Sequence, residues 1–598
     1  MAPKKKRKVM AKRFYSAEEA AAHCMASSSE QTSGSDSEYV PPASESDSST
    51  EESWCSSSTV SALEEPMEVD EDVDDLEDQE AGDRADAAAG GEPAWGPPCN
   101  FPPEIPPFTT VPGVKVDTSN FEPINFFQLF MTEAILQDMV LYTNVYAEQY
   151  LTQNPLTRYA RAHAWHPTDI AEMKRFVGLT LAMGLIKANS IESYWDTTTV
   201  LSIPVFGATM SRNRYQLLLR FLHFNNNATA VPPDQPGHDR LHKLRPLIDS
   251  LSERFANVYT PCQNICIDES LLLFKGRLQF RQYIPSKRAR YGIKFYKLCE
   301  SSSGYTSYFL IYEGKDSKLD PPGCPPDLTV SGKIVWELIS PLLGQGFHLY
   351  VDNFYSSIPL FTALYCLNTP ACGTINRNRK GLPRALLDKK LNRGETYALR
   401  KNELLAIKFF DKKNVFMLTS IHDESVIREQ RVGRKPKNKP LCSKEYSKYM
   451  GGVDRTDQLQ HYYNATRKTR HWYKKVGIYL IQMALRNSYI VYKAAVPGPK
   501  LSYYKYQLQI LPALLFGGVE EQTVPEMPPS DNVARLIGKH FIDTLPPTPG
   551  KQRPQKGCKV CRKRGIRRDT RYYCPKCPRN PGLCRKPCFE IYHTQLHY

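Results

Sequence analysis

The chain has 598 residues and a net charge of +15, with 78 Lys and Arg against 63 Asp and Glu. It contains no run of eighteen apolar residues and no secretory leader after the first methionine, which argues against a membrane-spanning or secreted disulfide-rich protein. The charge is unevenly distributed, because residues 10–114 sum to −21 and residues 115–598 to +31. A folded body this basic favours a polyanionic partner, and nucleic acid is the leading candidate.

The first 116 residues are predicted to lie outside any folded domain. Residues 1–9, MAPKKKRKV, form a basic run of the nuclear-import type directly before Met10. We interpret them as an appended nuclear localisation signal for an import receptor, and we expect a nuclear protein. Residues 10–116 are rich in Ser, Glu, Asp and Pro, too polar for a core, and are predicted to be disordered. Their serines beside acids suit an acid-directed kinase, although a merely solubilising tail fits equally well.

Two helical regions flank a segment of different pattern. Residues 117–262 show apolar spacings of three and four, with Thr168-Asp169 as a predicted helix cap, and are assigned to a helical domain. Residues 458–520 are predicted to be its second part, followed by a Pro-rich linker at 521–553.

The middle of the chain follows an α/β order. Residues 263–372 read as strand, hairpin turning at Ser301–Gly304, amphipathic helix and strand, which is typical of an α/β core. Residues 373–438 are predicted to be an insertion domain with short strands, and residues 439–457 to return to the core.

Acidic residues mark the ends of two predicted strands. Asp268 ends NICID and Asp352 ends HLYVD, while Asp454 and Asp457 lie three apart on a predicted helix and so share one face. Phosphoryl transfer on DNA uses two hard cations about 4 Å apart, held by carboxylates from several elements. A single Asp after a strand is more often a turn residue, so the prediction depends on the group and on the basic body.

Basic residues interleaved with aromatics follow each of these acids. Such runs are usually solvated surface, but cations beside a metal site suit a DNA-cutting enzyme, and an aromatic ring can stack on an unpaired base. The predicted DNA contacts are Lys275, Arg277, Tyr283, Lys287, Arg290, Arg377, Arg379, Lys380, Arg467, Lys468, Arg470, Trp472, Lys474 and Lys475.

Residues 554–598 are predicted to be a cysteine-rich zinc domain. Two CxxC pairs, a Cys-x3-Cys pair and a His-x3-His pair supply enough ligands for two tetrahedral zinc sites. Unbound thiols are the alternative, but a segment this small lacks a hydrophobic core and needs bound metal or cross-links to stay folded. A ubiquitin-ligase-like module is disfavoured by 14 Lys and Arg against 2 acids in residues 551–598. Alternation suggests one site of Cys558, Cys561, Cys584 and Cys588 and another of Cys574, Cys577, His593 and His597.

From about residue 117 to its end, the chain resembles the piggyBac-type DNA transposases, with the amphibian Uribo-type branch nearest. The resemblance rests on many motifs in one order, including ESYWDT, MSRNRYQLLLRFLHFNNN, IDESLLLFKGR, QYIPSKRARYGIK, VDNFYSS, GTINRNRKGLP, YMGGVDRTDQ, RKTRHW and CFEIYHT.

The resemblance implies a multidomain α/β protein with an RNase H-like catalytic core and an inserted small β-rich domain. A flanking helical DNA-binding and dimerisation domain and a C-terminal zinc domain complete it. The family's catalytic triad falls on Asp268, Asp352 and Asp454, with Asp457 a further acid beside the Mg²⁺ or Mn²⁺ site. Asn376 stands where many relatives carry Arg, which puts the target-DNA contact at that position in doubt.

The resemblance also implies a homodimer that cuts and joins double-stranded DNA. It would excise a transposon through hairpin ends and integrate it at TTAA sites. A domesticated relative that binds DNA or chromatin without transposing is the alternative.

Overall fold

The computed structural model describes residues 94–98, 104–197, 200, 202–285, 287, 289–315, 319–431, 434–517, 540–577 and 579–595. The predicted import signal and the acidic part of the tail lie outside the described residues. Within the described ranges, no helix is both long and apolar enough to cross a membrane.

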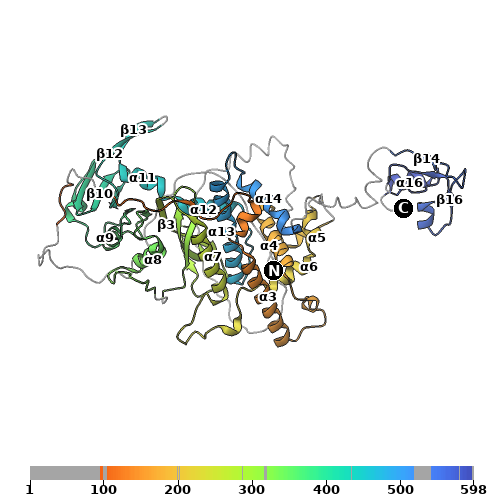
Figure 1. Cartoon of the computed structure of the whole chain (residues 1–598), viewed down its shortest axis with the longest axis horizontal. Helices are drawn as coiled ribbons and strands as arrows, with labels where there is room; N and C mark the ends of the chain where they lie inside the picture. The colour runs from red at the N-terminus through yellow and green to blue at the C-terminus, as the bar shows by residue number, and fades with distance from the viewer. Residues whose placement is uncertain are drawn as a thin grey trace, which may run out of the picture. The chain divides into compact units, whose positions relative to one another are not determined.

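A twisted sheet forms the centre of the body (Figure 1). Five of its strands lie in the spatial order β6-β5-β3-β7-β8, antiparallel from β6 to β3 and parallel from β3 to β8. The turn between β5 and β6 falls at residues 301–304, as predicted. This mixed order fits an RNase H-like core and confirms the predicted fold class. The bounds are β3 (Asn264–Leu273), β5 (Tyr291–Glu300), β6 (Thr306–Ile311), β7 (His348–Val351) and β8 (Ala371–Thr374), with the short β4 (Gln282–Tyr283) on β5.

The segment predicted as an insertion extends this sheet. Its strands β11 (Asn414–Thr419), β10 (Leu404–Phe410) and β9 (Thr396–Lys401) continue antiparallel beyond β8. The open edge of β8 would otherwise leave backbone groups unpaired, and this addition covers it. The segment also carries α10 (Arg384–Asp388), and β12 (Val426–Arg431) pairs with β13 (Arg434–Pro440) in a separate hairpin.

Helices cover both faces of the sheet. Ile265 and Val351 belong to the cluster that packs against α8 (Val330–Ile339) and α9 (Ile358–Cys366). Their neighbours Cys266 and Tyr350 face the other side, toward α11 (Leu441–Tyr449) and α12 (Gly452–Tyr462). Side chains alternate along a strand, so Asp268 and Asp352, two residues further on, are directed toward the α12 side.

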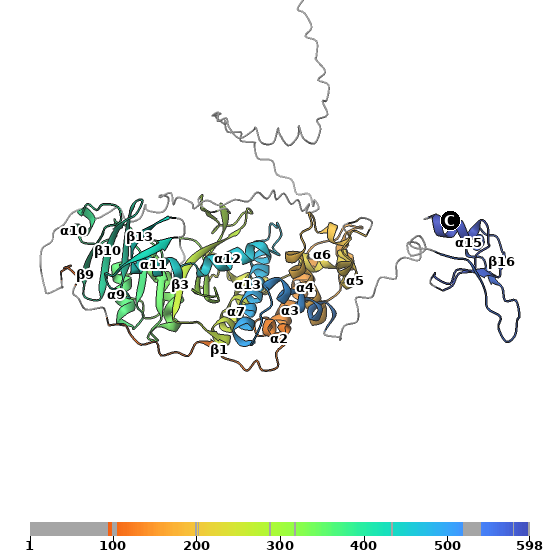
Figure 2. The same ribbon diagram turned by 90° about the horizontal axis from the view of Figure 1, so that it is seen from above.

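The helical part combines segments from both sides of the core in sequence. Figure 2 shows the later helices α13 (Trp472–Ala495) and α14 (Tyr503–Phe516) among the earlier ones, in one apolar cluster. Asp169 caps α4 by accepting a hydrogen bond from the Glu172 amide at 2.7 Å, which confirms the predicted cap. The earlier helices are α2 (Pro123–Gln128), α3 (Glu133–Gln153), α4 (Ile170–Leu185), α5 (Pro204–Thr209), α6 (Arg212–Phe221) and α7 (Arg245–Val258).

The last part of the predicted disordered tail is ordered against the core. The ring of Phe108 meets that of Phe347 edge-on at 5.0 Å, and the indole of Trp95 donates to the Gly381 carbonyl at 3.1 Å. Strand β1 (Gly113–Val114) pairs with β2 (Tyr259–Thr260). The prediction of disorder was therefore wrong for residues 104–116, because an average composition does not register single contacts such as that between Phe108 and Phe347.

The C-terminal module is small and has little regular structure. Its elements are β14 (Asp543–Thr544), β15 (Lys556–Gly557), α15 (Lys559–Lys563), β16 (Asp569–Thr570), β17 (Tyr572–Tyr573) and α16 (Cys588–Thr594). Its buried cluster consists largely of six cysteines with Val560, Leu583 and Tyr592. So few apolar side chains cannot stabilise a fold of this size without bound metal or cross-links.

Candidate active site and metal-binding clusters

Two of the predicted carboxylates meet where β7 ends beside β3. The prediction that Asp268 ends its strand was wrong, because β3 continues past Asp268 to Leu273 by pairing with β5. Ile267 on β3 is level with Val351 on β7, so Asp268 and Asp352 follow side by side. Their carboxylates lie in a group whose ligand atoms are all within 4.8 Å of one another. The carboxylate of Asp268 accepts from the Glu269 amide at 2.8 Å, and that of Asp352 from the Phe354 amide at 3.0 Å. The core topology therefore builds a two-carboxylate site from residues 84 positions apart.

Glu269 is the third member of this group and was not predicted. Strict alternation would send it to the opposite face from Asp268. Its carboxylate nevertheless joins those of Asp268 and Asp352, with Lys287 Nζ 3.8 Å away and the Tyr355 hydroxyl donating at 3.5 Å. The only signal in the sequence was that a second acid directly follows Asp268.

The negative charges of this carboxylate group are not fully compensated by neighbouring protein groups. Burial, followed by repulsion from Glu269 and Asp352, raises the pKa of Asp268 well above its usual range. Burial and the charge of Glu269 raise the pKa of Asp352 to about 6. Two lysines, Lys287 and Lys294, oppose these shifts without cancelling them. Three crowded carboxylates of this kind fit a hard divalent cation, whose preferred ligands are oxygens.

The raised pKa values give a sign to the pH dependence of stability. The contribution of the raised pKa of Asp352 to the free energy of unfolding is fully present below its ordinary pKa of 3.8 and is lost as pH rises through about 6. A divalent cation relieves the repulsion between ionised carboxylates, so we expect Mg²⁺ to raise the melting temperature more at pH 8 than at pH 5. Thermal unfolding of the metal-free full chain with added Mg²⁺ measures this. An equal response at both values, or the same response after Asp268→Asn with Asp352→Asn, would contradict it.

The other two predicted metal ligands are on α12 and do not join the group. Asp454 is exposed on the first turn of α12, a helix that packs on β3 and β5. The carboxylate of Asp457 is 3.0 Å from the ammonium of Lys297. The four predicted ligands are thus divided between β3 and the end of β7, where Asp268 and Asp352 meet, and the helix α12.

The predicted DNA contacts differ widely in exposure. Among the partly buried ones, Arg379 donates to the Phe354 carbonyl at 2.6 Å, and Arg467 donates to the Ala188 carbonyl at 2.9 Å. The ring of Trp472 packs edge-on against Phe280 at 5.4 Å, and Lys287 pairs with Glu269. The exposed ones are Lys275, Arg277, Tyr283, Arg290, Arg377, Lys380, Lys468 and Arg470.

Two of these predictions are corrected by burial. Lys474 and Lys475 are only 5% and 8% exposed. The ammonium of Lys474 donates to the Arg220 carbonyl at 2.5 Å, and burial lowers the pKa of Lys475 to about 8. Both lie on α13, which is buried on nearly all sides, so a basic sequence run did not mean a basic surface here.

The first cysteine cluster contains the four residues grouped by the sequence: Cys558, Cys561, Cys584 and Cys588. The sulfur of Cys561 is 3.9 Å from that of Cys584 and 3.5 Å from that of Cys588. A tetrahedral zinc ion at about 2.3 Å from each sulfur separates two sulfurs by about 3.8 Å. Although burial opposes ionisation, hydrogen bonds from the Cys561 and Cys584 amides lower the pKa of Cys558 to about 7.

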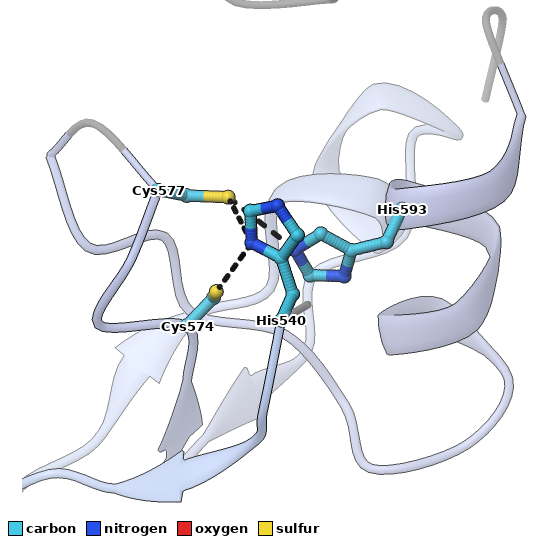
Figure 3. A group of neighbouring side chains, drawn as sticks. All are labelled: His540, Cys574, Cys577 and His593. Atoms are coloured by element: carbon cyan, nitrogen blue, oxygen red, sulfur yellow. Dashed lines mark hydrogen bonds between the residues drawn. The ribbon is translucent and has the colours of Figure 1, made fainter. Parts of the chain in front are cut away.

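The second cluster has a ligand that sequence reasoning missed. His540, Cys574, Cys577 and His593 converge (Figure 3), whereas the predicted His597 lies outside the described residues. The Nδ1 atom of His540 is 3.4 Å from the sulfur of Cys574, and the Nε2 atom of His593 is 3.3 Å from that of Cys577. The other nitrogen of His593 bonds the Phe589 carbonyl at 2.7 Å, which orients the ring as zinc-bound histidines are oriented. His540 lies in the predicted linker, and no other Cys or His is close to it in sequence. Ligand spacing therefore gave no signal for it.

Comparison with known families gives two matches. The family model described as Transposase IS4 matches residues 122–489, and that described as DDE_Tnp_1-like zinc finger matches residues 548–594. His540 precedes the second match.

Individual relatives are distant but extensive. Human PiggyBac transposable element-derived protein 3 is 26% identical over 493 residues, covering 79% of this chain and 76% of that protein. Human PiggyBac transposable element-derived protein 5 is 24% identical over 386 residues, covering 62% and 70%. Among solved structures, the cryo-EM structure of a piggyBac transposase synaptic complex with hairpin DNA matches with a TM-score of 0.62. It is 24% identical and covers 78% of this chain and all of that one, a similarity of fold.

Proposed function

The chain belongs to the piggyBac-type transposases of the family described as Transposase IS4, and we propose on that premise that it is an active cut-and-paste DNA transposase. The observation that carries the proposal is the group of Asp268, Glu269 and Asp352, which forms where β7 ends beside β3. Crowded, buried carboxylates with raised pKa values are typical of functional sites, and DNA binding alone does not require them.

The proposed reaction is phosphoryl transfer on DNA, first by water and then by the freed 3′-hydroxyl. Asp268 and Asp352 would hold Mg²⁺ or Mn²⁺, with Glu269 in the same group of ligand atoms and Asp454 as a further ligand supplied by α12. The cation would activate the attacking oxygen and neutralise charge on the scissile phosphate. Attack of the 3′-hydroxyl on the opposite strand would close a hairpin on each transposon end, and the reopened ends would join at TTAA.

The remaining regions have proposed roles in assembly. The helical part formed by residues before and after the core would build a homodimer on DNA. The C-terminal module would bind two structural zinc ions and recognise transposon ends through its basic surface. The import signal at residues 1–9 would bring the protein to the nucleus.

A direct experiment separates this function from DNA binding alone. The purified full chain is incubated with Mg²⁺ and a DNA library in which randomised ends flank TTAA, and cleaved products are sequenced and run on a denaturing gel. We expect hairpin-ended fragments cut at TTAA from a selected subset of ends. Selective binding without any cutting would support the alternative, a domesticated binding protein, which the relatives described as transposable element-derived suggest.

Exposed cations that follow Asp268 in sequence should contribute to DNA affinity through phosphate contacts. Lys275 and Arg277 are exposed in the segment between β3 and β4. We expect Lys275→Ala and Arg277→Ala each to weaken binding for all sequences alike and to reduce the slope of log affinity against log salt by about 1. Lys500→Ala, an exposed lysine between α13 and α14, serves as the matched control. A slope unchanged by the first two variants would place the DNA path elsewhere.

A further inference from the structure

Lys297 is a fully buried lysine in the middle of the catalytic core. It lies on β5, in register with Asp268 on the neighbouring strand β3, and its side chain is 0% exposed. It shares a face with Cys299, which belongs to the cluster under α11 and α12. A buried ammonium ion needs compensating partners, because its desolvation is costly.

Its partners come from two helices. The ammonium donates to the carboxylate of Asp457 on α12 at 3.0 Å and to the hydroxyl of Tyr479 on α13 at 2.8 Å. It also lies 5.2 Å from the centre of the Tyr479 ring. The charge of Lys297 therefore joins the core strand β5 to α12, which carries Asp454, and to α13 of the flanking helical part.

Further contacts hold α12 in the same place. The guanidinium of Arg486, on α13, donates to the Arg455 carbonyl at 3.1 Å and to the Ser303 carbonyl at 3.2 Å. The hydroxyl of Thr456 donates to the Gly304 carbonyl at 2.8 Å. The two residues directly after Asp454 in sequence are thus tied to the β5–β6 turn or to α13, and the position of Asp454 depends on these ties.

We propose that Lys297 and Asp457 form a positioning pair that holds α12, and with it Asp454, against β3 and β5, and that Asp457 is not a cation ligand. The inference deepens the proposed function and rests on it for the role of Asp454. Asp457 supplies a counter-charge to Lys297, which explains its carboxylate without a metal ion.

The two members of the pair differ in how much they need each other. The side chain of Asp457 is 37% exposed, so it can be solvated without Lys297. Lys297 is wholly buried, so loss of Asp457 leaves an uncompensated charge in the core. If Lys297 is replaced as well, no charge is left uncompensated in the core, and the stability lost with Asp457 should be regained. If Asp457 were instead a cation ligand, replacing Lys297 on β5 could not restore the activity lost with Asp457.

The test compares Asp457→Asn, Lys297→Met and the double variant in the full chain. We expect Asp457→Asn to lower the melting temperature by about 5 °C or more and DNA cleavage by about 10²-fold, since small misplacements of catalytic groups have effects of that size. The double variant should recover most of the melting temperature and at least a tenth of parental cleavage, with the parent's Mg²⁺ requirement.

The control is a second buried lysine on the same sheet. Lys408, on β10, is 5% exposed and donates to the carbonyls of Leu387 and Lys389. Five strand spacings along the sheet separate β10 from β5, roughly 24 Å, so Lys408→Met should not rescue Asp457→Asn.

Two outcomes would overturn the proposal. One is a double variant that regains stability but neither cleavage nor the Mg²⁺-induced rise in melting temperature, which would make Asp457 a ligand. The other is additive melting-temperature effects of the two substitutions. If the parent chain cuts no DNA, the proposed function fails, whereas the melting temperatures and their Mg²⁺ response still test the pair.

Discussion

Replacing Asp268 or Asp352 by Asn is expected to abolish strand cleavage, by at least about 10³-fold, without unfolding the protein. Loss of a single preorganised group that stabilises transition-state charge typically has an effect of 10²–10³, roughly, and these carboxylates would place the cation as well. The fold should survive, because burial raises both pKa values and an uncharged amide relieves the repulsion within the group. Activity and stability should therefore move in opposite directions.

Cleavage of the selected DNA ends and thermal unfolding at pH 8 measure the two effects on the same preparations. Asp320→Asn is a suitable control, since the side chain of Asp320 is 90% exposed and pairs only loosely with Lys333, at 3.8 Å. Parental cleavage in either Asn variant would refute the catalytic assignment. A large fall in melting temperature would mean that these carboxylates have structural partners in the metal-free protein.

Removal of zinc is expected to unfold the C-terminal module. The buried cluster there consists mainly of cysteines, so little remains to hold residues 540–595 together without metal. Structural zinc sites in small domains contribute about 10–16 kcal/mol of binding free energy, which becomes folding free energy. Metal analysis of the full chain should give two zinc ions, and chelation should make the module susceptible to proteolysis while residues 104–517 stay folded. A chain that contains no zinc would contradict this prediction.

The identity of the fourth ligand in the second cluster can be tested with a matched pair of variants. His540→Ala should release one zinc ion per chain, because its Nδ1 atom lies 3.5 Å from the sulfur of Cys577 and 3.4 Å from that of Cys574. His597→Ala should keep both ions. The reverse result would restore the ligand set predicted from the spacing of His593 and His597.

Local patterns were sufficient for several features. The order of strand, hairpin, helix and strand indicated an α/β core, and the topology confirmed it. The spacing of the CxxC pairs grouped Cys558 and Cys561 with Cys584 and Cys588, the four that converge in the structure. These inferences were possible because period, turn chemistry and ligand spacing are properties of short segments.

Other features depended on packing between distant segments. Lys474 and Lys475 looked like a DNA-binding run, but α13 buries them within the helical part. Residues 104–116 looked disordered, but Phe108 finds the ring of Phe347. Asp457 matched a metal-site acid, but Lys297, 160 residues earlier, holds its carboxylate.

Periodicity, charge asymmetry and motif order were enough to indicate that this chain contains a mixed α/β core, flanking helices, a cysteine-rich end and acids on or directly after core strands. They could not establish which acids meet. Asp268, Glu269 and Asp352 converge because β3 and β7 are neighbours in register, whereas Asp457 is held away from them by a lysine on β5. Short-range patterns record how each segment folds, but the surroundings of a charge are set by the elements that pack around it.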